Sequence, residues 1–127
     1  MSPWPSDFPV AIEQSDDFRI LNRIAPLAPD LAVRIRPTLD KDRKELDLSF
    51  RHFRSRCIEL SRAQIRAVNK LIVQCAEEVV FYRDDQPWVD PFVAKNAGYR
   101  IEPRSLETPH GKGYISWHTM RVAPREP

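Results

Sequence analysis

The stretch that begins at Ser61 restricts the fold more than any other part of the chain. From Ile65 onward apolar residues recur at steps of three and four, the spacing of one face of an α-helix. This stripe consists of Ile65, Val68, Ile72, Cys75 and Val79, widened by Leu71 and Ala76. Ser61 followed by Gln64 is typical of a capping box, in which each side chain hydrogen-bonds the backbone N–H of the other residue. The pattern predicts one main amphipathic helix over about 61–82, packed through its apolar side. The side predicted to face water carries Arg62, Arg66, Asn69, Lys70, Gln74, Glu77 and Glu78.

Two regions are typical of β-strands. Residues 31–37, "LAVRIRP", alternate Val33 and Ile35 with Arg34 and Arg36, which predicts a strand with its arginines in water. In the tail, the β-rich runs "GYRIEPRS" and "GYISWHTMRV" flank "LETPHGKG", a connection that predicts a C-terminal β-hairpin. The predicted fold is therefore α+β, with a small antiparallel sheet packed on the one main amphipathic helix.

The segment over residues 45–60 has two interpretations. "ELDLSFR" alternates apolar and polar residues and favours a strand over 45–52. The helical alternative is a stripe at steps of four and three, formed by Leu46, Phe50, Phe53, Cys57 and Leu60. We favour the strand, because a helix would turn Leu48 and Ile58 to water.

The first 30 residues form a predicted Pro-rich arm. Proline fixes the backbone angle φ and restricts the residue before it, so the five prolines here favour extended chain. Helical spacing of Phe18, Leu21 and Ile24 predicts a short helix near 16–25. Residues 31–127 are expected to form a single α+β domain.

Composition indicates a soluble cytoplasmic protein. Of the 127 residues 42% are hydrophobic and 30% charged, and no apolar run is long enough to cross a bilayer, so no membrane contact is expected. The start of the sequence lacks the basic and apolar regions of a secretory signal. Cys57 and Cys75 lack metal-binding spacing and are expected to be buried thiols in a reducing compartment.

The strongest candidate site is the arginine run "RHFRSRCIELSRAQIR", residues 51–66. The guanidinium group matches phosphate and carboxylate in shape and charge, and a helix N-terminus favours an anion. The candidate residues are Arg51, Arg54, Arg56, Arg62 and Arg66. The alternative is that they only solvate one face and pair with acidic segments, since residues 71–90 hold five acidic residues against one arginine.

No residue pattern indicates catalysis, a metal or a cofactor. "TPHGKG" is not a phosphate-binding P-loop, and His52, His110 and His118 lack the spacing of zinc ligands. Asp84, Asp85 and Asp90 are expected to end an element in water, and we expect Cys57 in the core rather than as a nucleophile beside His52.

Three functions are compatible with these features. The first is a small non-catalytic accessory or adaptor protein that binds another protein or itself, using Trp4, Phe8, Trp88, Phe92 and Trp117. The second is a module that uses the arginine run to bind nucleic acid or a phosphorylated ligand, with binding that weakens steeply in salt. The third is an enzyme without a short motif.

Overall fold

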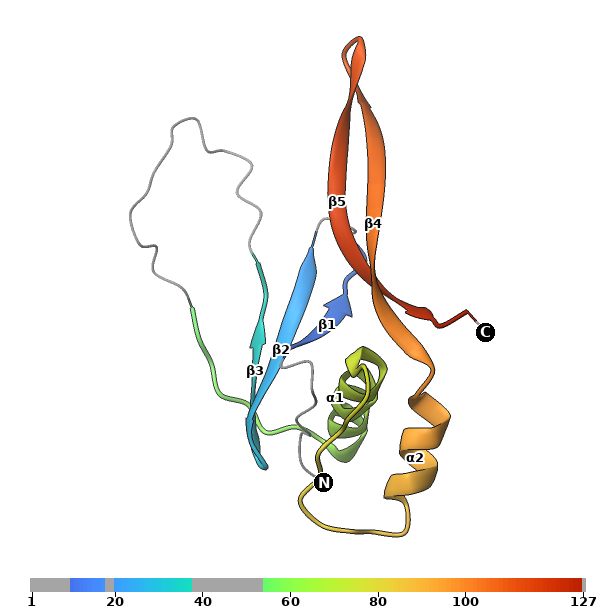
Figure 1. The fold of residues 1–127 in the computed structure, drawn as a ribbon. Helices are drawn as coiled ribbons and strands as arrows, with labels where there is room; N and C mark the ends of the chain where they lie inside the picture. The colour runs from blue at the N-terminus through green and yellow to red at the C-terminus, as the bar shows by residue number, and fades with distance from the viewer. Residues whose placement is uncertain (1–9, 18–19, 38–53, 127) are drawn as a thin grey trace.

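The computed structural model describes residues 10–17, 20–37 and 54–126, which form two antiparallel sheets and two helices (Figure 1). The elements are β1 (Ala11–Gln14), β2 (Leu21–Ala28), β3 (Leu31–Ile35), α1 (Arg62–Cys75), α2 (Val89–Asn96), β4 (Tyr99–His110) and β5 (Gly113–Pro124). The predicted α+β class is confirmed. The predicted strand over 45–52 and its helical alternative lie outside the described residues, except for Cys57 and Leu60. Neither helix in the described part of the chain is long and apolar enough to span a lipid bilayer.

The first sheet has the strand order β1-β2-β3. β2 is central, so that Ile24 lies opposite both Ala11 of β1 and Arg34 of β3. The short helix predicted near 16–25 is wrong for residues 21–25, which belong to β2. The spacing of Leu21 and Ile24 is compatible with a helix or a strand. The segment forms a strand because its backbone hydrogen-bonds to a neighbouring strand on each side. These pairings cross the predicted boundary at residue 30, although the division into an arm and a domain stays a prediction.

The start of α1 agrees with the sequence pattern. The Ser61 N–H donates to Gln64 Oε1 at 2.8 Å, and the Gln64 N–H donates to Ser61 Oγ at 3.3 Å. The predicted end at about residue 82 is wrong, because α1 ends at Cys75 and Ala76 is extended. The guanidinium group of Arg125 donates to the carbonyls of Ala76 (3.5 Å) and Glu77 (2.7 Å), which a longer helix would use for its own N–H groups. Val79, predicted in the buried stripe, is consequently 43% exposed.

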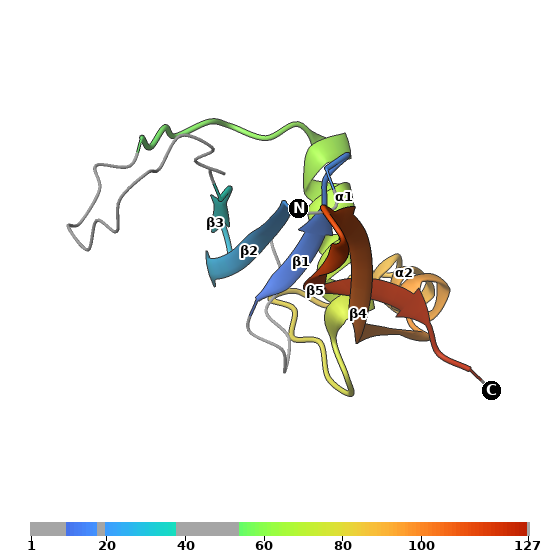
Figure 2. The same ribbon diagram turned by 90° about the horizontal axis from the view of Figure 1, so that it is seen from above.

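The core lies where α1 meets β1 and the lower part of β4 (Figures 1 and 2). Its buried residues are Ala11, Ile12, Ile24, Val68, Ile72, Val73, Cys75 and Val89. The prediction placed α1 on one face of a single sheet. In the structure α1 instead packs on β1 of the first sheet and β4 of the second. Asn69, predicted to face water, is completely buried, and its amide oxygen and nitrogen have no hydrogen-bond partner among the described residues. Such a group is costly to bury, by about 1–3 kcal/mol.

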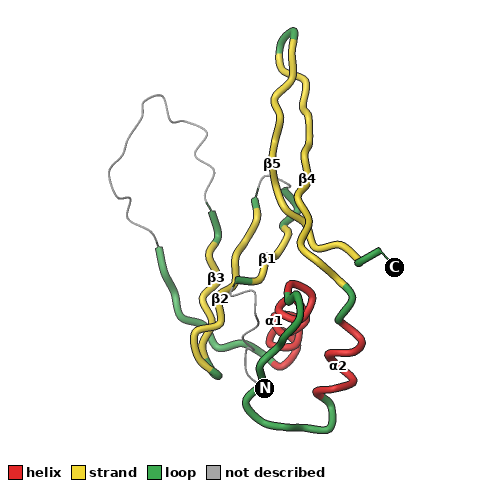
Figure 3. The backbone as a smooth tube through the Cα atoms, viewed as in Figure 1, coloured by secondary structure: helices red, strands yellow, loops and turns green. Residues whose placement is uncertain are grey.

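The second sheet consists of β4 and β5, paired along their whole length from Tyr99–Pro124 to His110–Gly113. Gly111 has φ +58°, a left-handed conformation that glycine adopts without strain, and it forms the connection with Lys112. At the other end, Arg125 donates from its backbone N–H to the Gly98 carbonyl at 2.7 Å and from Nε to the Tyr99 carbonyl at 2.9 Å. Figure 3 shows the far ends of both strands extending past the other described elements.

Candidate interaction surfaces

Four of the five candidate arginines lie in the described part of the chain, and all four are exposed. Arg54 and Arg56 belong to the extended segment 54–60, and Arg62 and Arg66 lie one turn apart on α1. Arg51 lies outside the described residues. Within the described ranges none of the four forms an ion pair. The structure brings Arg62 and Arg66 together on one helical surface.

The described members of the predicted interface aromatics, Trp88, Phe92 and Trp117, do not form one surface. Trp88 precedes α2 and is 38% exposed, and its ring meets that of Phe92 edge to face with centroids 6.0 Å apart. Phe92 is half-buried against the core. Trp117 lies far away on β5, opposite Leu106 of β4. Trp4 and Phe8 lie outside the described residues.

The hairpin formed by β4 and β5 has two distinct halves. Near its base, Ile101, Met120 and Val122 pack against the core. We call residues 105–118 the distal hairpin; each of its strands reaches roughly 20 Å, at about 3.3 Å per residue. One face of the distal hairpin pairs Leu106 with Trp117 and Thr108 with Ile115.

The opposite face of the distal hairpin is more polar. Ser105 lies opposite His118, and Pro109 lies opposite Tyr114, which is 71% exposed. An isolated two-stranded hairpin is marginally stable in water. The distal hairpin therefore presents large side chains on a scaffold that the body of the protein does not cover.

A second exposed apolar surface lies on β2 and β3. Leu31, Val33 and Ile35 point to the same side of β3, and all are exposed, as is Leu27 of β2. Arg34 and Arg36 are exposed as predicted, so the apolar side and the arginine side of this segment both reach water. Arg34 lies on the other side of the sheet, where its guanidinium group pairs with the Glu13 carboxylate at 3.1 Å.

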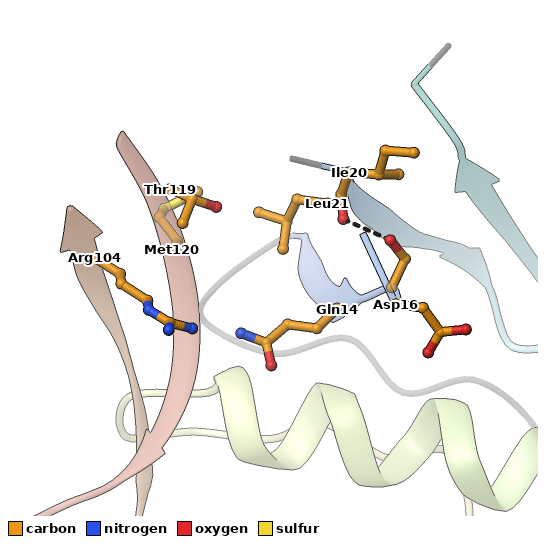
Figure 4. Close-up of a pocket in the computed structure, with 8 residues that line it drawn as sticks. Gln14, Asp16, Ile20, Leu21, Arg104, Thr119 and Met120 are labelled. Atoms are coloured by element: carbon orange, nitrogen blue, oxygen red, sulfur yellow. Dashed lines mark hydrogen bonds between the residues drawn. The ribbon is translucent and has the colours of Figure 1, made fainter. Parts of the chain in front are cut away.

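Two of the cavities among the described residues can be compared with a ligand site in size and chemistry. The smaller, about 110 Å³, lies between the β1–β2 connection and the hairpin, with Asp16, Gln14 and Arg104 at its wall (Figure 4). The Ser15 hydroxyl lies 2.9 Å from the Asp17 carbonyl oxygen and 3.0 Å from that of Ile20, and it fixes this connection. The volume is well below the roughly 300–1,000 Å³ of typical ligand pockets. This cavity is therefore smaller than typical binding sites for organic ligands.

The larger cavity, about 450 Å³, is an open groove between the end of α1 and α2. Val73, Val80 and Val93 give it apolar walls, while Glu77, Glu78 and Asp90 contribute carboxylates. Of the described residues, neither a histidine nor a cysteine lines this groove. The groove thus offers shape and negative charge, without a nucleophile next to a base.

The one contact that resembles a catalytic pair lies outside both cavities. Ser105 Oγ and His118 Nδ1 are 3.2 Å apart on the exposed hairpin. A serine nucleophile also requires a group that orients the histidine and donors that stabilise an oxyanion. Within the described ranges this pair has neither an acidic partner nor a place in the two cavities, so we interpret it as a cross-strand contact.

The cysteines occupy different environments. Cys75 is buried, and its Sγ accepts the Ile12 N–H at 3.5 Å. Burial raises the pKa of the Cys75 thiol, an effect only partly opposed by that hydrogen bond. Cys57 was expected in the core and is exposed instead, because segment 54–60 is extended and does not continue an apolar helical stripe. Among the described residues no group of three or more potential ligands could hold a metal ion.

Comparisons with known proteins give no relative. No protein-family model matches the chain, no curated protein matches it, and no solved structure matches its fold. Any function must therefore be argued from the surfaces described above.

Two exposed groups of residues escaped the sequence reasoning. The sequence pattern predicted only a strand for Tyr114 and Ile115. Their position next to a tight turn is a signal of exposure, because side chains at the end of a hairpin lie far from its base. On β3, the alternation of Val33 with Arg34 indicates two faces without showing which one is covered.

Proposed function

We propose that this chain is a small non-catalytic adaptor that binds another protein through its distal hairpin. The observation that carries the proposal is the exposure of Tyr114 and Ile115 at the end of two 12-residue strands whose base alone packs on the core. Tyr114 and Ile115 belong neither to the core nor to the side chains packed against it. Aromatic residues are enriched at protein–protein interfaces, which gives them a role there.

Backbone geometry supports a protein partner as well. In the described part of the chain β4 and β5 pair only with each other, so each has a free edge. A partner strand can add to such an edge, with main-chain hydrogen bonds providing affinity and side chains providing specificity. A strand added beside β5 would lie next to both Tyr114 and Ile115, although these two side chains point to opposite faces.

Site-directed photocrosslinking in the source cells tests this proposal. A photoreactive residue at position 115 should capture a defined protein, whereas one at the exposed position 83, away from the hairpin, should not. The Tyr114→Ser change should reduce capture from position 115 without affecting the fold, since Tyr114 is 71% exposed. Equal capture from both positions, or capture that Tyr114→Ser leaves unchanged, would contradict a hairpin interface.

A nucleic-acid or phosphate-binding function is the second candidate, and the unpaired arginines favour it. Arg54, Arg56 and Arg62 are exposed and carry no ion pair within the described ranges, next to a helix N-terminus that favours anions. Binding through them would weaken steeply as salt rises, because counterions are released from the nucleic acid.

Retention on heparin and binding of labelled single-stranded RNA test this second candidate at low and moderate salt. The double change of Arg54→Ala with Arg56→Ala should lower both. The matched control is Arg83→Ala with Arg100→Ala, which removes two arginines that pair with Asp84 and Glu102. Absence of binding at low salt, or equal loss in the two double variants, would exclude recognition by Arg54 and Arg56.

We also propose the cytoplasm as the compartment. Both cysteines of the chain are free thiols, and free thiols are typical of reducing compartments.

A further inference from the structure

The outer edge of β3 is the starting observation. One edge of β3 pairs with β2, and no strand in the described part of the chain pairs with the other. The apolar side of β3 is exposed by 48% at Leu31, 40% at Val33 and 54% at Ile35. Proteins usually protect such an edge with charges, prolines or a covering segment, because it is a template for another strand.

We propose that β3 pairs with β3 of a second copy of this chain, antiparallel and about a two-fold axis at Val33. The two three-stranded sheets would then join into one sheet of six strands. The interface is isologous, since each copy contributes the same strand, and it closes at a dimer. The proposal concerns a different surface from the distal hairpin, and either can fail without the other.

The order of side chains along β3 favours this register. Val33 lies opposite Val33 of the second copy, and Leu31 lies opposite Ile35, so all three apolar residues meet apolar partners. Directly opposite residues in antiparallel strands point to the same face and lie close enough to interact. The exposed apolar side of each copy therefore continues into that of the other.

Charge complementarity supports the same register. It brings Asp30 of one copy opposite Arg36 of the other, twice by symmetry. Both residues are exposed, and neither has an ion pair within the described residues. Arg34 comes opposite Ala32, so its ion pair with Glu13 remains in place.

Neighbouring registers fit less well. With the axis at Arg34, two like charges would lie directly opposite each other, which is destabilising. With the axis at Ala32, Ile35 would lie opposite Pro29, which has no N–H to donate to the ladder. The sequence of β3 thus selects Val33 as the centre.

Disulfide trapping tests both the pairing and its register. In a Cys57→Ser background, Val33→Cys should cross-link to a dimer under mild oxidation, because opposite Cα atoms about 4.5–5.5 Å apart suit a disulfide. Leu31→Cys alone is the matched control. Its two copies would be roughly 13 Å apart along the strands, beyond the reach of a disulfide. Mixing Leu31→Cys with Ile35→Cys should restore the dimer.

Two results would overturn the proposal. One is the absence of a Val33→Cys dimer, as expected if another segment of the same chain covers β3. The other is cross-linking of Leu31→Cys alone at the same rate as Val33→Cys, which would indicate random collision.

A charge exchange provides a second test that requires no oxidation. Light scattering should give the mass of two chains for the unmodified protein and of one chain for Asp30→Arg or Arg36→Asp. The double variant Asp30→Arg/Arg36→Asp should return to the mass of two chains, because the opposite charges are then exchanged in place. A mass of one chain for the unmodified protein, or a double variant no larger than the single ones, contradicts the proposed register.

Discussion

β1 and β3 are the two outer strands of the same sheet, and they differ in what lies beside them. Ala11 and Ile12 of β1 are each only 2% exposed, since β1 packs on α1 and donates the Ile12 N–H to the Cys75 thiol. β3 lacks such a neighbour in the described part of the chain, and Leu31, Val33 and Ile35 remain exposed. An apolar side chain on a strand therefore stabilises this fold only where α1 or the base of the hairpin meets it.

The largest expected effect separates the two strands directly. Ile12→Ala should lower the free energy of unfolding by about 2–5 kcal/mol, because it leaves a cavity in the core. Ile35→Ala should change it by less than about 0.5 kcal/mol at protein concentrations low enough to keep the chain monomeric. Urea unfolding of both variants measures the difference. Equal losses would mean that β3 is packed as tightly as β1.

Arg125 holds together the elements that bury β1, and its removal should have the next largest effect. Its side chain donates to the carbonyls of Ala76, Glu77 and Tyr99, which joins the end of α1 to the base of the hairpin. Arg125→Ala should reduce stability by about 1–3 kcal/mol, as lost hydrogen bonds to a charged group do. The control Arg83→Ala, which removes an exposed pair with Asp84, should have almost no effect. Thermal unfolding distinguishes the two, and similar melting temperatures would contradict this role of Arg125.

The N-terminal cap of α1 allows a smaller test of the helix on which β1 rests. Ser61→Ala removes one half of the capping box and should cost about 1 kcal/mol. Ser116→Ala, an exposed change on the distal hairpin, should cost little. If chemical denaturation finds no difference between these variants, the cap does not contribute to the stability of α1.

The smallest expected effect is a pH dependence of stability in the hairpin of β4 and β5, away from both outer strands of the first sheet. The hydrogen bond from Arg121 holds the pKa of Glu102 below its usual value, with Arg100 contributing further attraction. A carboxyl group with a lowered pKa in the folded state stabilises the fold above its unfolded pKa, and this contribution disappears as pH falls through the folded pKa. Acidification should therefore loosen β4 against β5, and Glu102→Gln should remove that step. Near-ultraviolet circular dichroism of the two proteins across the acid range measures it; identical acid transitions would contradict the assignment to Glu102.

Local sequence signals predicted those parts of the fold that local interactions decide. The Ser61–Gln64 box and the apolar spacing after Ile65 depend on neighbouring residues, and α1 begins where they indicate. After its end, the carbonyl of Ala76 accepts from Arg125, 49 residues away in sequence, and no local pattern shows this contact. The same reason explains why Leu21 and Ile24 suggested a helix: only pairing with β1 and β3 makes that segment a strand.

The candidate surfaces were predictable to a similar extent. The sequence indicated that Arg62 and Arg66 lie on the solvent side of a helix, and the structure places them there. On β3 the arginine side is exposed as predicted, but the side with Val33 is exposed as well, and the alternation of Val33 with Arg34 does not show this. The polar side chain of Asn69 predicted a position on the solvent side of α1. The buried part of the helix surface extends around to Asn69 and covers it completely.

Hydrogen–deuterium exchange of the backbone amides tests the contrast between β1 and β3 most directly, because it reports protection strand by strand. In dilute protein, peptides covering β1 and α1 should exchange slowly, whereas those covering β3 and the distal hairpin should exchange quickly. Raising the protein concentration should slow exchange in β3 and leave the distal hairpin unchanged. A β3 that is as protected as β1 in dilute protein would contradict the account, because its outer edge would then already be covered within one chain.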